Sequence, residues 1–305
     1  MKDEALQDLQ QALLRRLGRE AHLDPYTRAL YSTDASNHRI TPLGVFFPRD
    51  LDEVQAAVEL AAEREVPLLP RGSGTSLGGQ AVGEALILDC SRHLNRILEI
   101  DPEVGRATVE PGVVCQILNL RAAKVGRMYG PDPASADRAT FGGMIGNNAT
   151  GAHSIRYGMS ADHLVECEVV LSDGSRASLG PMGEGEAAAK AQAEGVEGAA
   201  YRTALDLRVS HGQAIRQAWP RTWRRASGYG LNYLLGYSPS APPAWYATPA
   251  PYPPAEGVNL APLLCGSEGT LAIIGRATVR LVERPAATVL ALLTFDSVAE
   301  ACDAT

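Results

Sequence analysis

The chain has 305 residues, of which 45% are hydrophobic and 21% are charged, a composition typical of a soluble globular protein with enough residues for two domains. The net charge of -7 argues against a general nucleic-acid surface, because phosphate backbones are bound by clustered Lys and Arg. No run approaches the roughly 18 apolar residues of a membrane helix, and the N-terminus lacks the apolar region of a signal peptide. We therefore expect a cytoplasmic protein without a transmembrane segment.

The cysteines give no sign of a metal centre. They stand singly, at Cys90, Cys115, Cys167, Cys265 and Cys302. No C-x-x-C pair occurs, and no histidine lies at the spacing of a zinc ligand. We predict reduced thiols and no metal site in this chain.

The first half of the chain alternates helical and strand patterns. Leucines recur at helical spacing over residues 3–19, and a second helix fits residues 51–64 between Pro48 and Pro67. Strands are predicted at residues 45–47, 66–69, 85–89, 107–109 and 167–171. Such a mixture indicates an α/β or α+β domain.

A glycine-rich segment from Pro70 to Gln80 lies between two of these strands. Its glycines lack a β-carbon, so the backbone can take positive φ and direct successive N–H groups at one anion. Hydroxyl groups and one positive charge add to the donors. The residues concerned are Arg71, Gly72, Ser73, Gly74, Thr75, Ser76, Gly78 and Gly79. A flexible surface turn is the alternative.

Two common phosphate-binding motifs do not fit this segment. The dinucleotide motif G-x-G-x-x-G opens a helix, whereas the spacing from Gly74 to Gly78 is one residue too long and a strand follows. The nucleoside triphosphate loop requires a lysine, and none lies between Lys2 and Lys124. A Rossmann fold and a nucleotide triphosphatase are therefore disfavoured.

Two further glycine-rich segments follow, from Gly130 to Gly151 and from Gly266 to Thr270. Prolines stiffen the start of the first, and its glycines and asparagines allow tight turns near a ligand. The second is predicted as a turn between two strands. Taken singly, each is equally well explained by a turn without a ligand.

The character of the chain changes between residues 180 and 257. Alanine, glutamate and lysine dominate residues 184–198, a helix is predicted over 200–218, and residues 239–254 are rich in proline. We interpret this region as a helical insertion that ends in a surface loop. Strands are then expected at 263–265, 271–274, 277–282 and 289–295, and a helix at 297–302. We expect the last two elements to begin a domain that continues beyond Thr305.

Together and in this order, four segments resemble the flavin-binding half of the FAD-linked oxidases of the p-cresol methylhydroxylase and vanillyl-alcohol oxidase type. The segments are residues 70–80, 110–113, 130–158 and 266–274. The resemblance extends to Tyr31 to Ser36 and is closest to the branch that oxidises 2-hydroxy acids, which includes glycolate oxidase D subunits, D-lactate dehydrogenases and D-2-hydroxyglutarate dehydrogenases. Residues 215–220 and 224–232 are similar to members fused to a C-terminal iron-sulfur module.

The resemblance implies an α+β fold, an FAD-binding PCMH-type domain made of two α/β subdomains with a helical insertion. It places an N-terminal helical segment at 1–44 and the first part of the FAD-binding domain at 45–179. The insertion occupies 180–257, and the last strands of the domain occupy 258–284. Residues 285–305 would begin a C-terminal substrate domain, the cap.

The resemblance also implies cofactor contacts. The segment from Arg71 to Gly79 would wrap the FAD pyrophosphate through backbone N–H groups, and Gly269 and Ile274 would contact the flavin through their backbones. Glu268 would bind ribose or adenine, or would be an exposed turn residue. The second wall of the groove would consist of Pro131, Ser135, Thr140, Gly142, Gly143, Asn147 and Gly151.

The attachment of the flavin is expected to be non-covalent. Covalent members of the family carry a histidine just after the glycines of the first loop, where this sequence has Thr75, Ser76 and Leu77. His153 follows the second segment, and a structural hydrogen-bonding role is favoured there over flavin attachment.

The implied reaction is transfer of a hydride from C2 of a 2-hydroxy acid, of the D-lactate, glycolate or D-2-hydroxyglutarate class, to FAD. The base is expected beyond Thr305. Arg224 and Arg225 are the candidates in this chain for the substrate carboxylate, with solvent-facing charges as the alternative. A second hypothesis is a flavin-binding electron-relay subunit that needs partner chains for substrate and iron-sulfur clusters. Peripheral association with the inner membrane is an alternative to a purely cytoplasmic location. A cell-wall reductase that uses the same flavin fold with NADPH is more distant.

Overall fold

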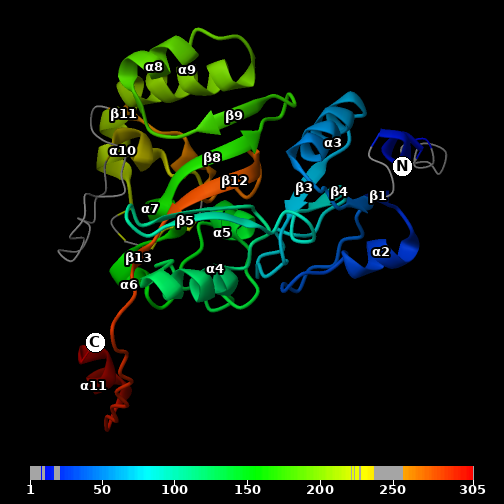
Figure 1. The fold of residues 1–305 in the computed structure, drawn as a ribbon. Helices are drawn as coiled ribbons and strands as arrows, with labels where there is room; N and C mark the ends of the chain where they lie inside the picture. The colour runs from blue at the N-terminus through cyan, green and yellow to red at the C-terminus, as the bar shows by residue number, and fades with distance from the viewer. Residues whose placement is uncertain are drawn as a thin grey trace.

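The computed structural model describes residues 8, 11–16, 21–220, 222, 224–226, 228–236 and 257–304. Two sheets form two subdomains that lie side by side, and the C-terminal residues project away from both of them (Figure 1). None of the helices in these ranges has the length and apolar character needed to cross a membrane. The predicted proline-rich loop at 239–254 lies outside the described residues, and the predicted N-terminal helix is seen as helical residues 11–16.

The first subdomain is a four-stranded sheet with the strand order β1-β2-β4-β3. Strand β1 is antiparallel to β2, whereas β2, β4 and β3 are parallel. The strands are β1 (Ala21–His22), β2 (Gly44–Phe46), β3 (Leu68–Arg71) and β4 (Leu86–Asp89). The short helix α2 (Pro25–Leu30) precedes β2. Each predicted strand of this subdomain is present, with ends shifted by one or two residues.

Helix α3 (Leu51–Glu63) connects β2 to β3 and confirms the predicted helix. It begins where the Asp50 side chain accepts a hydrogen bond of 2.9 Å from the N–H of Glu53, which satisfies a free donor of the first turn. Its buried face packs on the four-stranded sheet and also on Val170 and Ile273 of the second subdomain. The two subdomains therefore share an apolar contact through α3.

The second subdomain is a five-stranded antiparallel sheet with the order β5-β6-β12-β8-β9. Its strands are β5 (Ile97–Asp101), β6 (Arg106–Val109), β8 (Leu164–Val170), β9 (Arg176–Leu179) and β12 (Ile273–Arg280). Strand β12 comes last in sequence but lies in the centre, between β6 and β8 (Figure 1). The segment after the insertion therefore completes the sheet that the earlier strands begin.

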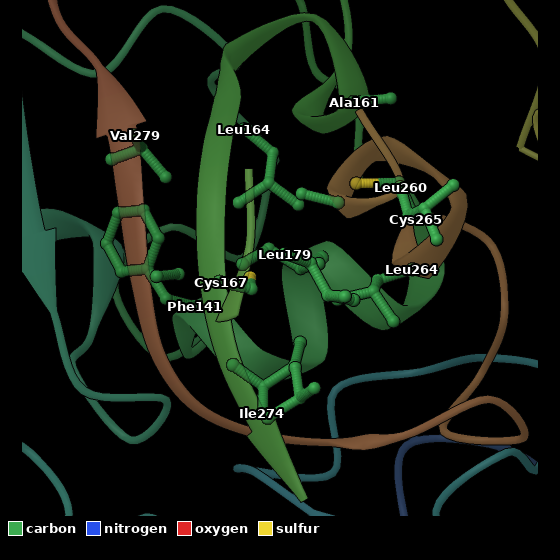
Figure 2. Packing of buried hydrophobic residues seen from close by; sticks show 14 of the residues in the cluster. Phe141, Ala161, Leu164, Cys167, Leu179, Leu260, Leu264, Cys265, Ile274 and Val279 are labelled. Atoms are coloured by element: carbon green, nitrogen blue, oxygen red, sulfur yellow. The ribbon is translucent and has the colours of Figure 1, made fainter. Parts of the chain in front are cut away.

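Helices and short strands surround this sheet. Helices α8 and α9 lie beside β9, and α4 lies on the opposite side of the sheet (Figure 1). Before the insertion the elements are α4 (Cys115–Ala122), η2 (Ala123–Val125), β7 (Arg127–Met128), α5 (Phe141–Asn147), α6 (Ser154–Tyr157) and α7 (Ser160–His163). Figure 2 shows Leu164 and Cys167 of β8 packed with Val279 of β12 and Phe141 of α5. Phe141 thereby fixes α5 to the core of the sheet.

The segment between residues 180 and 257 is closed at its base by a pair of short strands. Strands β10 (Met182–Gly183) and β11 (Gly257–Val258) are antiparallel partners. The other elements are α8 (Glu184–Lys190), α9 (Gly195–Ser210), α10 (Gly212–Ala218) and η3 (Leu231–Leu235). The mixed architecture confirms the predicted α+β fold with a helical insertion, whereas the domain boundaries remain predictions that the β10–β11 pair supports.

Several predicted elements near the end of the chain were wrong. Residues 261–264 form the 3-10 helix η4 (Ala261–Leu264) instead of a strand, because Pro262 in its first turn has a helical φ and no N–H for a ladder. The strands expected at 271–274 and 277–282 are the single strand β12, followed by β13 (Val282–Glu283), which pairs with β7. Residues 289–295 are exposed and have no strand partner in the described ranges, while α11 (Val298–Asp303) confirms the final helix.

The second glycine-rich segment contains a helix that we did not predict. Glycines favoured tight turns in this segment, yet residues 141–147 form α5. Phe141, Met144 and Ile145 are buried at helical spacing, and their contacts with the core outweigh the low helix propensity of the glycines.

Candidate functional site

The three glycine-rich segments meet at one place, which we call the three-segment junction (residues 70–80, 130–151 and 266–274). A β-carbon on Gly72 would lie 2.0 Å from Thr140 Oγ1, and one on Gly269 would lie 2.7 Å from Pro70 Cγ. The N–H of Glu268 donates a hydrogen bond of 3.0 Å to the carbonyl of Gly146. The glycines therefore let chain segments from both subdomains approach more closely than side chains would permit.

The first loop presents a run of free backbone donors. Within the described part of the chain, none of the N–H groups of residues 72–77 donates a hydrogen bond. The hydroxyl groups of Ser73, Thr75 and Ser76 also have no hydrogen bond to another described residue. Successive free N–H groups in a glycine-rich turn are suited to binding an anion such as a phosphate.

The loop is anchored to residues 31–35. The Arg71 guanidinium donates to the carbonyls of Ala81 at 2.7 Å and Thr33 at 2.9 Å, and the carbonyl of Gly74 accepts from the N–H of Ala35 at 3.0 Å. Burial lowers the pKa of Arg71. The guanidinium lies against protein carbonyls and joins the two ends of the loop, and the contact of Arg71 with the cofactor stays a prediction.

Thr140 forms the facing wall at the start of α5. Its side chain is buried, and its Oγ1 has no hydrogen-bond partner among the described residues. A buried hydroxyl without a partner costs free energy unless a ligand or water satisfies it. This hydroxyl lies beside Gly72, so a donor from the second subdomain adjoins the free N–H groups of the first. The predicted residues Gly142 and Gly143 lie in the same first turn of α5.

The remaining residues of the second segment shape its backbone. A β-carbon on Gly151 would lie 1.4 Å from the carbonyl oxygen of Asp132, so only glycine fits where the two ends of the segment cross. Pro131 is buried, and the carbonyl of Ser135 accepts from two N–H groups of a turn. His153 Nδ1 lies 2.9 Å from Asp132 Oδ2, a contact that agrees with the predicted structural role of this histidine.

The third segment contributes Glu268 and Gly269 at positive φ, and Ile274 at the start of β12. The Glu268 carboxyl group accepts a hydrogen bond of 3.0 Å from Asn147 Nδ2, and burial raises its pKa. Ile274 pairs with Val169 of β8, and its side chain lies in the core (Figure 2). The hairpin alternative for this segment is wrong, because η4 rather than a strand precedes the turn.

Arg224 and Arg225 lie beside the end of the second segment. Arg224 Nη2 is 3.4 Å from the carbonyl oxygen of Gly151, and the carbonyl of Arg225 accepts from Asn148 Nδ2 at 2.9 Å. The Arg225 guanidinium donates to the carbonyl of Thr222. The structure thus brings both arginines near the junction, and a role in substrate binding remains a prediction.

A buried polar cluster next to the junction escaped the sequence analysis. Asp162 accepts from Tyr233 OH at 2.6 Å and from the N–H of Met159, while both ring nitrogens of His163 face carbonyls, those of Tyr157 and Arg280. Burial raises the pKa of Asp162 and lowers that of His163. The polar run directly before β8 was the available signal, but such residues are more often exposed.

An open cavity of about 440 Å³ adjoins the junction between the two subdomains. Its lining is mostly apolar and comes from the end of α3, from β3 and from residues 269–273. The cavity therefore shares two residues, Pro70 and Gly269, with the junction.

Comparison with known proteins gives the ligand class. Residues 42–180 match the family described as FAD binding domain. Over these residues the chain is similar to FAD-binding domains. The free donors of the loop and the buried Thr140 hydroxyl fit the pyrophosphate of FAD, which carries negative charge and accepts hydrogen bonds. That this FAD is held without a covalent bond remains a prediction.

Relatives of this chain carry the names D-2-hydroxyglutarate dehydrogenase, D-lactate dehydrogenase and glycolate oxidase subunit. The chain is 34% identical over 261 residues to D-2-hydroxyglutarate dehydrogenase of Pantoea ananatis, covering 85% of this chain and 24% of that protein. It is 29% identical over 280 residues to a probable mitochondrial D-lactate dehydrogenase of Danio rerio, covering 91% and 43%. Glycolate oxidase subunit GlcD of Bacillus subtilis is 39% identical over 149 residues, which cover 48% and 32%.

Solved structures agree on the fold. An alkyldihydroxyacetonephosphate synthase superposes with a TM-score of 0.60 at 19% identity, covering 92% of this chain and 41% of that protein. The chain thus spans about a quarter of the D-2-hydroxyglutarate dehydrogenase relative and less than half of the structural neighbour.

We expect the substitution Gly72→Ala to raise the dissociation constant of FAD at least about tenfold, because its methyl group would overlap the Thr140 hydroxyl. Quenching of flavin fluorescence on titration measures this constant. Gly83→Ala is the matched control, since its β-carbon would meet only Leu69 at an ordinary 3.5 Å. Equal affinities of the two variants would contradict this account of the wall.

Arg71→Ala should also weaken FAD binding, since the loop ends lose their link to residues 31–35. The salt dependence of the dissociation constant should match that of the unmodified protein, because the guanidinium bonds to carbonyls and not to phosphate. FAD titrations at several salt concentrations test this, with the exposed Arg106→Ala as control. A markedly shallower salt dependence would instead place Arg71 on the pyrophosphate.

Proposed function

We propose that this chain is the flavin-binding part of an FAD-dependent enzyme that oxidises a 2-hydroxy acid of the D-lactate, glycolate or D-2-hydroxyglutarate class. The run of free N–H groups at residues 72–77 beside the buried Thr140 hydroxyl carries the flavin part of the proposal. The names of the relatives support the substrate class.

The chain's own residues would hold and orient the cofactor. FAD, when bound, supplies the acceptor for the hydride that leaves C2 of the hydroxy acid, while the hydroxyl proton passes to a base and a 2-oxo acid is formed. The loop N–H groups would donate hydrogen bonds to the pyrophosphate oxygens, and Thr140 would donate to them from the facing wall. Pro70 and Gly269 join this site to the apolar cavity, which is suited to the adenine end of the cofactor.

The buried histidine of the second subdomain does not meet the requirements for the base. Both ring nitrogens of His163 are within hydrogen-bonding distance of backbone carbonyls, at 2.7 Å and 3.1 Å. His153 is exposed and lies against Asp132. We therefore propose that neither of these two histidines is the base, and that Arg224 and Arg225 contribute positive charge for the substrate carboxylate.

The second candidate function is a flavin-binding subunit that relays electrons and depends on partner chains for the substrate and for iron-sulfur clusters. The resemblance to a protein named as a glycolate oxidase subunit favours it. The two candidates differ in whether this chain alone reduces its flavin.

We expect the purified protein to be yellow and to release FAD on treatment with acid. Anaerobic addition of D-2-hydroxyglutarate, D-lactate or glycolate then distinguishes the two functions through the flavin absorbance. Bleaching by one of these acids without another chain supports the dehydrogenase, while a flavin that is reduced only after a partner chain is added supports the relay subunit. Colourless protein that does not bind added FAD would contradict both.

A further inference from the structure

A buried asparagine ends α5, in the second glycine-rich segment. Asn148 follows the last helical residue with a φ of 53°, a left-handed conformation that asparagine tolerates better than most residues other than glycine. The residue is 6% exposed. A buried amide costs free energy unless both its oxygen and its NH₂ group find partners, so the partners of Asn148 show what its side chain holds in place.

The amide of Asn148 has a partner on each side. Its Oδ1 accepts a hydrogen bond of 2.9 Å from the N–H of Ala161 in α7, and its Nδ2 donates one of 2.9 Å to the carbonyl of Arg225. The opposite orientation would place the oxygen against a carbonyl and the NH₂ group against an N–H group, so the two partners fix the amide. Asn148 therefore joins the second subdomain to a segment that lies 77 residues later in the chain.

Arg225 belongs to a segment that we call the crossing segment (residues 224–226 and 228–229). Besides the hydrogen bond to its carbonyl, the N–H of Arg225 lies 3.3 Å from Met159 Sδ. Arg224 Nη2 lies 3.4 Å from the carbonyl oxygen of Gly151. The first end of the crossing segment is therefore held against the end of the second glycine-rich segment.

The other end of the crossing segment lies against the third glycine-rich segment. Tyr229 OH is 3.0 Å from Thr270 Oγ1, and that hydroxyl donates to the carbonyl of Ser267 at 2.6 Å, so Tyr229 is the donor of the first bond. A β-carbon on Gly266 would lie 2.6 Å from the carbonyl oxygen of Gly228, so the two backbones pass closely. The crossing segment therefore connects the second and third segments of the junction.

We infer that Asn148 is a positioning residue that fixes the crossing segment on the junction and so sets where Arg224 and Arg225 present their positive charge to the substrate carboxylate. Asn148 bonds the main chain of Arg225, while Arg224 is exposed and Arg225 is half-buried. Binding a carboxylate orders an arginine, and a main chain that is already fixed reduces the conformational entropy lost on binding. The inference rests on the proposed function, which assigns the substrate carboxylate to these arginines.

Two substitutions of Asn148 separate the side chain from the backbone. Asn148→Gly keeps the left-handed φ, which glycine adopts without strain, and removes both hydrogen bonds. Asn148→Asp keeps the acceptor for Ala161 but puts an oxygen in place of the donor to Arg225. Both substitutions should release the crossing segment. Asn95→Gly is the matched control, because this exposed amide bonds to carbonyls three and four residues earlier.

Limited proteolysis without FAD measures the release. Trypsin cleaves after arginine, and cleavage requires that the main chain leave its folded position. We expect the bonds after Arg224 and Arg225, identified by mass spectrometry, to be cleaved about tenfold faster in both variants of Asn148 and at an unchanged rate in Asn95→Gly. Thermal unfolding establishes that each variant is folded. Unchanged cleavage in the variants of Asn148 would overturn the inference.

Ligand binding measures the consequence for the arginines. The 2-oxo acids 2-oxoglutarate and pyruvate retain the carboxylate next to C2 but have no hydrogen at C2 to transfer, so their binding is followed through the absorbance of the oxidised flavin. We expect the dissociation constant of the 2-oxo acid that binds more tightly to rise about fivefold in Asn148→Gly, while that of FAD stays within about threefold of the unmodified protein. A general loss of structure would weaken both ligands together.

The outcomes separate this inference from the proposed function. Faster cleavage, weaker binding of the 2-oxo acid and normal binding of FAD in Asn148→Gly support the positioning role. Faster cleavage with unchanged binding of the 2-oxo acid overturns that role and leaves the proposed function standing. Unmodified protein that binds FAD but neither 2-oxo acid refutes the proposed substrate class and the inference with it. If Asn148→Gly does not fold, Asn148→Asp gives the same reading.

Discussion

The contact between Gly72 and Thr140 determines how the rest of the site can be arranged. The two residues belong to different subdomains, and a β-carbon at position 72 would come within 2.0 Å of the threonine hydroxyl. Among the described residues, the N–H groups of residues 72–77 have no acceptor, and the buried Thr140 hydroxyl beside Gly72 has no hydrogen-bond partner. Backbone donors without an acceptor at such a boundary are suited to binding an anion, and we propose that the FAD pyrophosphate is that anion.

The topology of the second sheet brings the third segment to this boundary. Strand β12 lies between β6 and β8. The residues just before β12 contact α5, where Asn147 Nδ2 donates a hydrogen bond to Glu268 Oε1. The insertion begins at β10 and ends at β11, and this strand pair lies away from α5 (Figure 1). Helix α3 adds an apolar contact between the subdomains. The site therefore depends on packing between segments that are distant in sequence.

Local patterns predicted the elements whose neighbours in sequence are also their neighbours in space. The parallel strands and α3 of the first subdomain follow from apolar periodicity and from the proline and aspartate residues at their ends. For these elements the sequence signal and the physical cause coincide. The anion site that the glycines of the first loop indicate stays a prediction.

Tertiary contacts decided the features that the sequence did not predict. Helix α5 contains three glycines and forms because Phe141 and its neighbours reach the core (Figure 2). The guanidinium of Arg71 finds carbonyls from residues 31–35, which no local pattern reveals. The buried pair of Asp162 and His163 has, besides the nearby Met159 and Tyr157, two partners that are remote in sequence, Tyr233 and Arg280. Side-chain direction at a site depends on partners that are remote in sequence.

Hydrogen exchange of the backbone amides at residues 72–77, with and without FAD, tests the central claim most directly. The account predicts fast exchange in the protein without FAD, since these N–H groups have no protein acceptor, and strong protection once FAD is bound. Exchange of the 72–77 amides that remains fast when FAD is bound would contradict the assignment of this loop as the pyrophosphate site.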